Sequence, residues 1–219
     1  MPRNRPTRGF TLIELLAVIA IIGVLAAIVL LSMGKVRETT RRAGCASNLR
    51  QIGVLIQLHT QDNKGRLPGP LWTTFGPYPS DNDTGLLVYQ LQRYLTDKIQ
   101  LNGARPHIKI FECPSWAEAV PVAEQLNGRC YVVGRAAKVA GGGTVMPFGY
   151  PQLGNNAAAS PLMINQMENP AKTLAVTDLD AVNGGPSYVN VAGVAASPVH
   201  GGVRNELYFD GRVAAVAVP

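Results

Sequence analysis

Residues that mark catalytic and metal centres are scarce in this chain. Its 219 residues include three His and three Cys. The sequence contains no Gly-x-Ser-x-Gly segment and no His-Glu-x-x-His segment, the usual marks of serine hydrolases and zinc proteases. It also has no Cys-x-x-Cys pair, so the common spacing of zinc ligands is missing. We therefore expect a protein that is not an enzyme.

Dense basic runs interleaved with aromatic residues are missing as well. The formal net charge is +6, but three of the 20 Lys and Arg precede Phe10, and the remaining 17 face 14 acidic residues. This balance predicts no nucleic-acid partner. Aromatic residues make up 6%, whereas 23 Gly and 16 Pro indicate a loop-rich domain. About 185 residues after the apolar segment suffice for one domain with its own core.

The N-terminal segment carries the most informative pattern. Arg8-Gly9-Phe10 is followed by Thr-Leu-Ile-Glu14 and then by an apolar run over residues 15–31. From Phe10 to Met33 the segment has about 24 residues, or about 36 Å as a helix. That length crosses a bilayer core of about 30 Å. A carboxylate such as Glu14 costs free energy inside a membrane segment, so its presence there needs an explanation.

Two plain interpretations compete for this segment. One is a secretory signal peptide cut after the small residues at 32–34, and the other is an anchor that is never processed. A signal-peptide core is usually shorter and contains no acid, so Glu14 argues against the first. Basic residues flank the segment on both sides, the second group being Lys35, Arg37, Arg41 and Arg42. Charge counting therefore does not orient the helix.

The segment closely resembles the signal of type IV pilins and type II secretion pseudopilins. The resemblance implies that prepilin peptidase cuts between Gly9 and Phe10 and that Phe10 is N-methylated. It also implies an N-terminus in the cytoplasm, other pilin-like subunits as partners, and an inner-membrane assembly platform. Glu14 would pair with the terminal ammonium of a neighbouring subunit, which offsets the desolvation of both charges. Alternatively, Glu14 lies at the membrane interface without a partner.

The rest of the chain predicts an α+β fold. An apolar stripe with helical spacing extends one long helix from about Phe10 to about Gln61, half in lipid and half amphipathic. The amphipathic half would pack on a small antiparallel sheet. Asp210-Gly211 predicts a tight type I′ hairpin turn. We expect strands at 107–111, 130–133, 173–177, 205–209 and 212–218, short helices at 85–95 and 116–127, and extended loops at 68–80 and 140–161.

A second resemblance involves the C-terminal part. His200 is followed by nine residues and then Asp210-Gly211, as in a pilin-like family that shares the prepilin N-terminus. That family often has His after Asp-Gly, whereas this chain has Arg212. His200 beside Asp178 or Asp210 would also suit a hydrolase, but no nucleophile is marked. We interpret His200, Asp210 and Gly211 as a structural motif that holds the loop beside the hairpin.

Two further hypotheses concern cysteines and carboxylates. Cys113 and Cys130 would enclose a short loop as a disulfide, with Cys45 left as a thiol, and the alternative is three unpaired cysteines. Asp178, Asp180 and Asp210 are candidate ligands for calcium, which the major pseudopilins of type II secretion carry in this part of their fold. The alternative is that Asp210 is only a turn residue and the other two end a strand.

Together these patterns predict a structural pilin-like subunit of a pseudopilus or type IV pilus-like fibre. We expect a leader at residues 1–9, a transmembrane half-helix at 10–34, an amphipathic half at 35–62 and a periplasmic domain at 63–219. The alternative is a membrane-anchored binding module that displays its loops to a ligand and forms no fibre.

Overall fold

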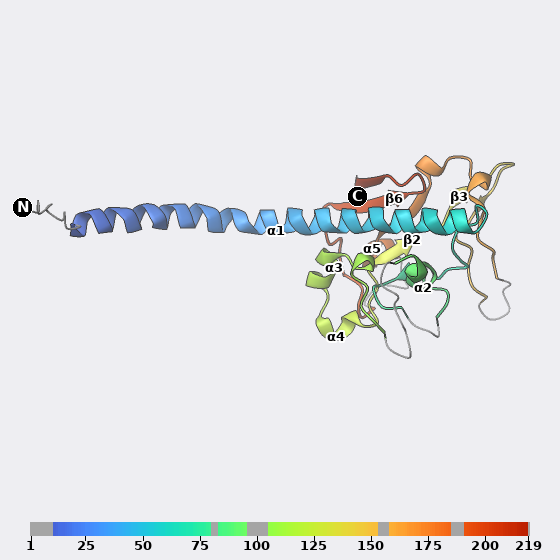
Figure 1. Ribbon diagram of the computed structural model, residues 1–219, viewed down its shortest axis with the longest axis horizontal. Coiled ribbons are helices and arrows are strands. Elements are labelled where there is room, and N and C mark those ends of the chain that lie inside the picture. Colours follow the sequence, from blue (N-terminus) through green and yellow to red (C-terminus); the bar gives the residue numbers. More distant parts are fainter. Residues whose placement is uncertain (1–10, 80–82, 96–104, 153–157, 185–190, 219) are drawn as a thin grey trace, which may run out of the picture. The chain divides into compact units, whose positions relative to one another are not determined.

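The computed structural model describes residues 11–79, 83–95, 105–152, 158–184 and 191–218. The chain divides into two compact units, residues 1–40 and 41–219. Helix α1 (Leu12–Asp62) contributes to both units (Figure 1). It confirms the long N-terminal helix predicted from the sequence. The chain leaves α1 through Lys64 and Gly65, whose φ angles of 56° and 86° end the helix.

The second unit contains an antiparallel sheet in the order β1-β2-β5-β6-β7. With α1, the sheet confirms an α+β fold of the pilin-like kind. The strands are β1 (Thr74–Phe75), β2 (Tyr131–Val133), β5 (Leu174–Asp178), β6 (Val203–Tyr208) and β7 (Val213–Ala217). A separate pair consists of β3 (Ala137–Lys138) and β4 (Thr144–Val145), so the predicted loop at 140–161 contains a short strand.

Short helices connect these strands. The α-helices are α2 (Leu87–Leu91), α3 (Pro114–Ala119), α4 (Val122–Gln125) and α5 (Ala181–Gly184). The 3-10 turns are η1 (Gln92–Tyr94), η2 (Lys109–Phe111), η3 (Ile164–Gln166) and η4 (Pro170–Lys172). The strand predicted at 107–111 is therefore wrong, because the chain coils there to bury Phe111 completely. Pro121 divides the helix predicted at 116–127 into α3 and α4.

The hairpin of β6 and β7 is confirmed, but its turn is not the predicted type I′. Gly211 has a φ of 87°, whereas Asp210 is not among the described residues with positive φ. The Tyr208 carbonyl accepts a hydrogen bond from Gly211 N at 2.9 Å, and Tyr208 N donates to the Arg212 carbonyl at 2.9 Å. This is a three-residue loop with one left-handed residue, the common bulged hairpin.

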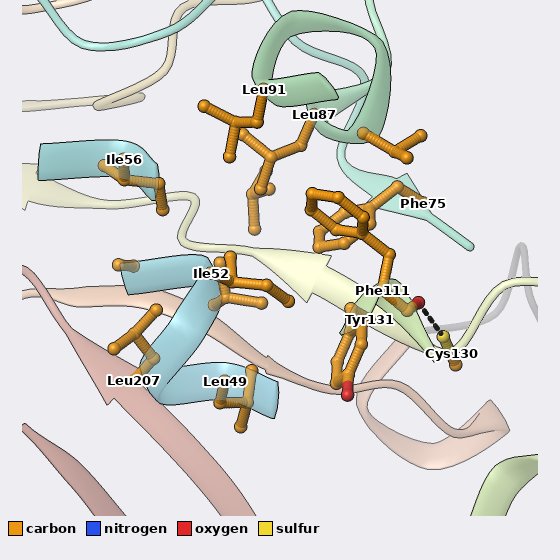
Figure 2. Close-up of a cluster of buried hydrophobic side chains, with 14 of the residues drawn as sticks. Leu49, Ile52, Ile56, Phe75, Leu87, Leu91, Phe111, Cys130, Tyr131 and Leu207 are labelled. Atoms are coloured by element: carbon orange, nitrogen blue, oxygen red, sulfur yellow. Dashed lines mark hydrogen bonds between the residues drawn. The ribbon is translucent and has the colours of Figure 1, made fainter. Parts of the chain in front are cut away.

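The core of the second unit lies between the sheet and the part of α1 that begins at Arg41. Leu49, Ile52 and Ile56 of α1 face Leu207 of β6 and a group of aromatic side chains (Figure 2). The buried stripe of α1 begins at Cys45. Each fully buried large side chain contributes about 1.5–3 kcal/mol. This packing holds α1 against β6 and fixes which of its side chains face inward.

Candidate functional site

The N-terminal end of α1 is closed by Thr11 and Glu14. Glu14 Oε2 accepts hydrogen bonds from Thr11 N at 2.9 Å and from Thr11 Oγ1 at 2.8 Å. Glu14 N donates to Thr11 Oγ1 at 3.3 Å. These reciprocal bonds form a capping box, which satisfies donors that a helix start leaves unpaired. The sequence contains its signal, Thr-x-x-Glu, but our sequence analysis considered Glu14 only as an assembly residue.

Residues 12–30 of α1 expose their apolar side chains in every direction. Leu12 is 81% exposed, Ile19 60% and Ile28 61%. The most apolar window of the helix has a mean hydropathy of 3.1 and no buried residue, so its length and composition suit a membrane span. Gly9 and Phe10, the predicted processing residues, lie outside the described part of the chain.

A second candidate site lies in the core of residues 41–219, where Cys45 and Cys113 form a disulfide. Their Cα atoms are 4.7 Å apart, a separation typical of disulfides. This corrects the prediction that Cys113 pairs with Cys130. The reason is tertiary: Cys45 is one turn before Leu49 on the buried face of α1, and it meets Cys113 at the start of α3.

Cys130 is a buried free thiol next to β2. Its Sγ donates a hydrogen bond to the Phe111 carbonyl at 3.2 Å (Figure 2). Burial raises the pKa of the Cys130 thiol well above its ordinary value. The thiol is therefore protonated and unreactive at neutral pH.

His200 and Asp178 lie against this disulfide. His200 Nε2 is 3.5 Å from Cys113 Sγ and 3.3 Å from Asp178 Oδ2, and the side chains of His200 and Asp178 are 0% and 3% exposed. Asp178 Oδ2 also accepts a hydrogen bond from Asn205 N at 2.8 Å. His200 thus ties the segment before β6 to the end of β5.

The three aspartates proposed as calcium ligands do not converge. Asp180 is 1% exposed and bonds to Arg204 at 2.7 and 2.9 Å. Asp178 faces His200, and Asp210 accepts a hydrogen bond from Arg212 N within the hairpin loop. Among the described residues, the three carboxylates form no cluster within ligand distance, so this prediction is corrected. Among the described residues, the potential metal ligands that do cluster are Cys45, Cys113 and His200.

Comparison with known proteins supports the N-terminal site. Residues 4–30 match the family model described as the prokaryotic N-terminal methylation motif, the prepilin-type signal of type IV pilins and pseudopilins. The match includes Gly9, Phe10 and Glu14, and it confirms the first resemblance. It does not reach His200 or Asp210-Gly211, so the C-terminal resemblance stays a prediction. The chain matches no curated protein and no solved structure.

Proposed function

We propose that this chain is a structural pilin-like subunit that prepilin peptidase cuts between Gly9 and Phe10 and methylates on Phe10. The mature subunit assembles with other pilin-like subunits into a type II secretion pseudopilus or a type IV pilus-like fibre, through an inner-membrane assembly platform. The observation that carries this proposal is a prepilin-type signal joined to a helix whose apolar side chains are exposed on every side.

The exposed helix explains why such a subunit needs two environments in turn. Burial of apolar surface contributes about 25 cal/mol per Å², so a helix exposed all round is stable only in lipid or among other apolar helices. Before assembly, the bilayer covers residues 10–34. In a fibre, helices of neighbouring subunits replace the lipid, and the domain at 63–219 forms the outer surface.

Glu14 serves both stages in this proposal. In the full chain it caps α1 through Thr11. Cleavage before Phe10 creates an ammonium group four residues from Glu14, and two unpaired charges in lipid are costly. The carboxylate of one subunit pairs with the ammonium of the next, so the assembled state removes a cost that both subunits bear alone.

The Cys45–Cys113 disulfide supports a domain outside the cytoplasm. Disulfides persist in oxidising compartments such as the periplasm and are rare in the cytosol. In this proposal, residues 1–9 lie in the cytoplasm, residues 10–34 in the inner membrane and residues 35–219 on the outer side. The charges flanking the helix do not decide this orientation, whereas the disulfide favours it.

The mature N-terminus tests the proposal. Intact mass and terminal sequencing would be compared between membranes from cells with and without prepilin peptidase. We expect a chain that begins with N-methylated Phe10 and that keeps its leader when the peptidase is missing. A Gly9→Leu variant serves as a processing-defective control in the same cells. A mature chain that begins at Lys35 would instead establish a secretory signal peptide and refute the fibre subunit.

A groove in the second unit favours one alternative, a membrane-anchored binding module. The groove is open and mainly apolar, and its described lining includes Leu55 of α1, Tyr94 and Ile108. Such a surface suits an apolar ligand or peptide. A processed chain that stays monomeric in the membrane after crosslinking, with or without Glu14, would support the binding module over the fibre subunit.

A further inference from the structure

Three buried donor side chains from separate segments meet in the second unit, and a fourth, Asp178, contacts one of them. Cys45 comes from α1, Cys113 from the start of α3, Asp178 from the end of β5 and His200 from the segment before β6. One donor atom each from Cys45, Cys113 and His200 lies within 4.8 Å of the others. Asp178 lies outside this group of three, but its Oδ2 is 3.3 Å from His200 Nε2.

The arrangement around His200 resembles a metal site more than a catalytic triad. In a triad, the histidine uses one ring nitrogen for the nucleophile and the other for the carboxylate. Here the same nitrogen, Nε2, faces both Cys113 Sγ and Asp178 Oδ2. Donors that surround one point instead of forming a chain are what a central cation requires.

The spacing of the donors fits tetrahedral zinc. Bond lengths of about 2.3 Å to sulfur and about 2.0–2.1 Å to nitrogen or oxygen place ligand atoms about 3.5 Å (S to N) and about 3.3 Å (N to O) apart. The structure has 3.5 Å between Cys113 Sγ and His200 Nε2 and 3.3 Å between His200 Nε2 and Asp178 Oδ2. To complete the site, the bond between the two sulfurs has to open and Asp178 has to move closer to the sulfurs.

Asp178 is prepared for a further interaction. Its Oδ1 is buried and accepts no hydrogen bond from the residues that the structure describes. Its Oδ2 is held by Asn205 N at 2.8 Å, and such a second contact orients a ligand and supports its negative charge. A buried carboxylate oxygen without a donor is costly, and a cation bound to this carboxylate would offset part of that cost.

We propose that Cys45, Cys113, His200 and Asp178 form a site for one Zn²⁺ when the Cys45–Cys113 disulfide is reduced. A dithiol or phosphine reductant supplies two electrons and breaks the S–S bond, and the two sulfurs take up two protons. Zn²⁺ then displaces these two protons and binds the thiolates, the imidazole and the carboxylate. Reoxidation by a small-molecule disulfide transfers two electrons to that disulfide, which is cleaved to two thiols, reforms the Cys45–Cys113 bond and releases the metal. The site therefore holds either a disulfide or zinc.

The test uses the full chain in detergent, reduced by a phosphine under anaerobic conditions, with Co²⁺ as a spectroscopic substitute and Zn²⁺ as its competitor. We expect the reduced protein to bind one Co²⁺ with the charge-transfer and visible bands of a tetrahedral thiolate site, and Zn²⁺ to displace it. The oxidised protein should bind none. Zn²⁺ should also raise the thermal midpoint of the reduced protein and leave that of the oxidised protein unchanged.

Substitutions assign the ligands. His200→Gln and Cys113→Ser should weaken binding at least about tenfold. Cys130→Ser is the matched control, because it removes the other buried thiol but keeps a donor for the Phe111 carbonyl. It should bind one metal ion as the unsubstituted chain does.

Several results would overturn the proposal. One is a reduced chain that keeps its native circular dichroism but binds no metal. Another is metal binding that is unchanged in a folded His200→Gln variant or lost in a folded Cys130→Ser variant. The comparison of the oxidised and reduced chains needs no substitution. It therefore tests whether reduction creates the metal site even if a variant fails to fold. Metal binding that persists in guanidinium would show ligation by an unfolded chain and also refute the site.

Discussion

Arg204 holds Asp180 through two parallel hydrogen bonds, from Nε to Oδ2 at 2.7 Å and from Nη2 to Oδ1 at 2.9 Å. The Asp180 side chain is 1% exposed and that of Arg204 14%. The pair joins β6 to the segment after β5, where Asp180 Oδ1 also accepts from Val182 N and Asn183 N. Asp180 is thus a structural residue whose oxygens are already satisfied.

Removal of Arg204 should therefore destabilise the domain strongly. Arg204→Ala leaves a buried carboxylate without its partner, which typically costs about 3–5 kcal/mol. Arg212→Ala is the matched control, because its guanidinium is half exposed and 3.9 Å from Asp210, and an exposed pair contributes about 0–1 kcal/mol. Thermal and denaturant unfolding of the full chain in detergent would measure both. Similar losses of stability in the two variants would contradict the structural role given to the Asp180–Arg204 pair.

Two glycines of α1 should respond differently to substitution. A Cβ at Gly53 would lie 2.9 Å from Leu207 Cδ1, whereas at Gly44 the nearest atom is Pro114 Cγ at an ordinary 3.5 Å. Gly44→Ala should stabilise the domain by up to about 1 kcal/mol through helix propensity. Gly53→Val should destabilise it by about 1–3 kcal/mol, because it overpacks the contact with β6. Denaturant midpoints would compare the two, and stabilisation by Gly53→Val would disprove the close packing.

His59 should make the domain less stable in acid. Burial lowers the pKa of His59, and the nearby Arg93 lowers it further, while Arg66 and Asp62 oppose the shift. Below the ordinary His pKa of about 6.5, the unfolded chain takes up a proton that the folded chain refuses. Stability should thus rise with pH through this range and level off above it.

The variant His59→Gln isolates this contribution. The substitution should flatten the pH dependence of the domain's stability between about pH 5 and pH 7. Unfolding midpoints measured in a pH series would show this change. The other two histidines remain in both proteins, so the difference between the two curves belongs to His59. Identical slopes would mean that His59 binds its proton equally well in the folded and unfolded chains.

The disulfide connectivity predicts one thiol in the native chain. Under denaturing, non-reducing conditions, only Cys130 should react with an alkylating reagent, and peptide mapping should find Cys45 joined to Cys113. The Cys45→Ser variant should lose about 4 kcal/mol, since the bridge spans 68 residues. A peptide that joins Cys113 to Cys130 would refute the structure at this point.

The charge of Glu14 and its capping role can be separated by two substitutions. Glu14→Gln keeps a capping-box residue but removes the charge, whereas Thr11→Ala removes the cap and keeps the charge. If pairing with a neighbouring ammonium drives assembly, Glu14→Gln should insert normally but fail to form crosslinked oligomers, and Thr11→Ala should still assemble. The reverse result would show that Glu14 acts only as a cap.

The N-terminal part of this protein could be predicted almost completely from its sequence. Length, hydropathy and the position of Glu14 are local properties, so the long helix and the prepilin-type signal follow without knowledge of any contact. The strands of the β6–β7 hairpin were also predictable, since Asp210-Gly211 lies between two apolar runs. Its turn type was not, because the φ angle of Asp210 depends on how the two strands pair.

The tertiary structure alone decided what the buried polar residues do. Cys45, Cys113, Asp178 and His200 lie far apart in the chain, and no spacing between them indicates that they meet. Their meeting depends on which face of α1 turns toward the sheet and on where α3 begins, which are results of packing. The sequence thus determined the helix and its signal, because local patterns encode them. Only the fold decided which cysteines pair, because contacts between distant segments leave no local pattern.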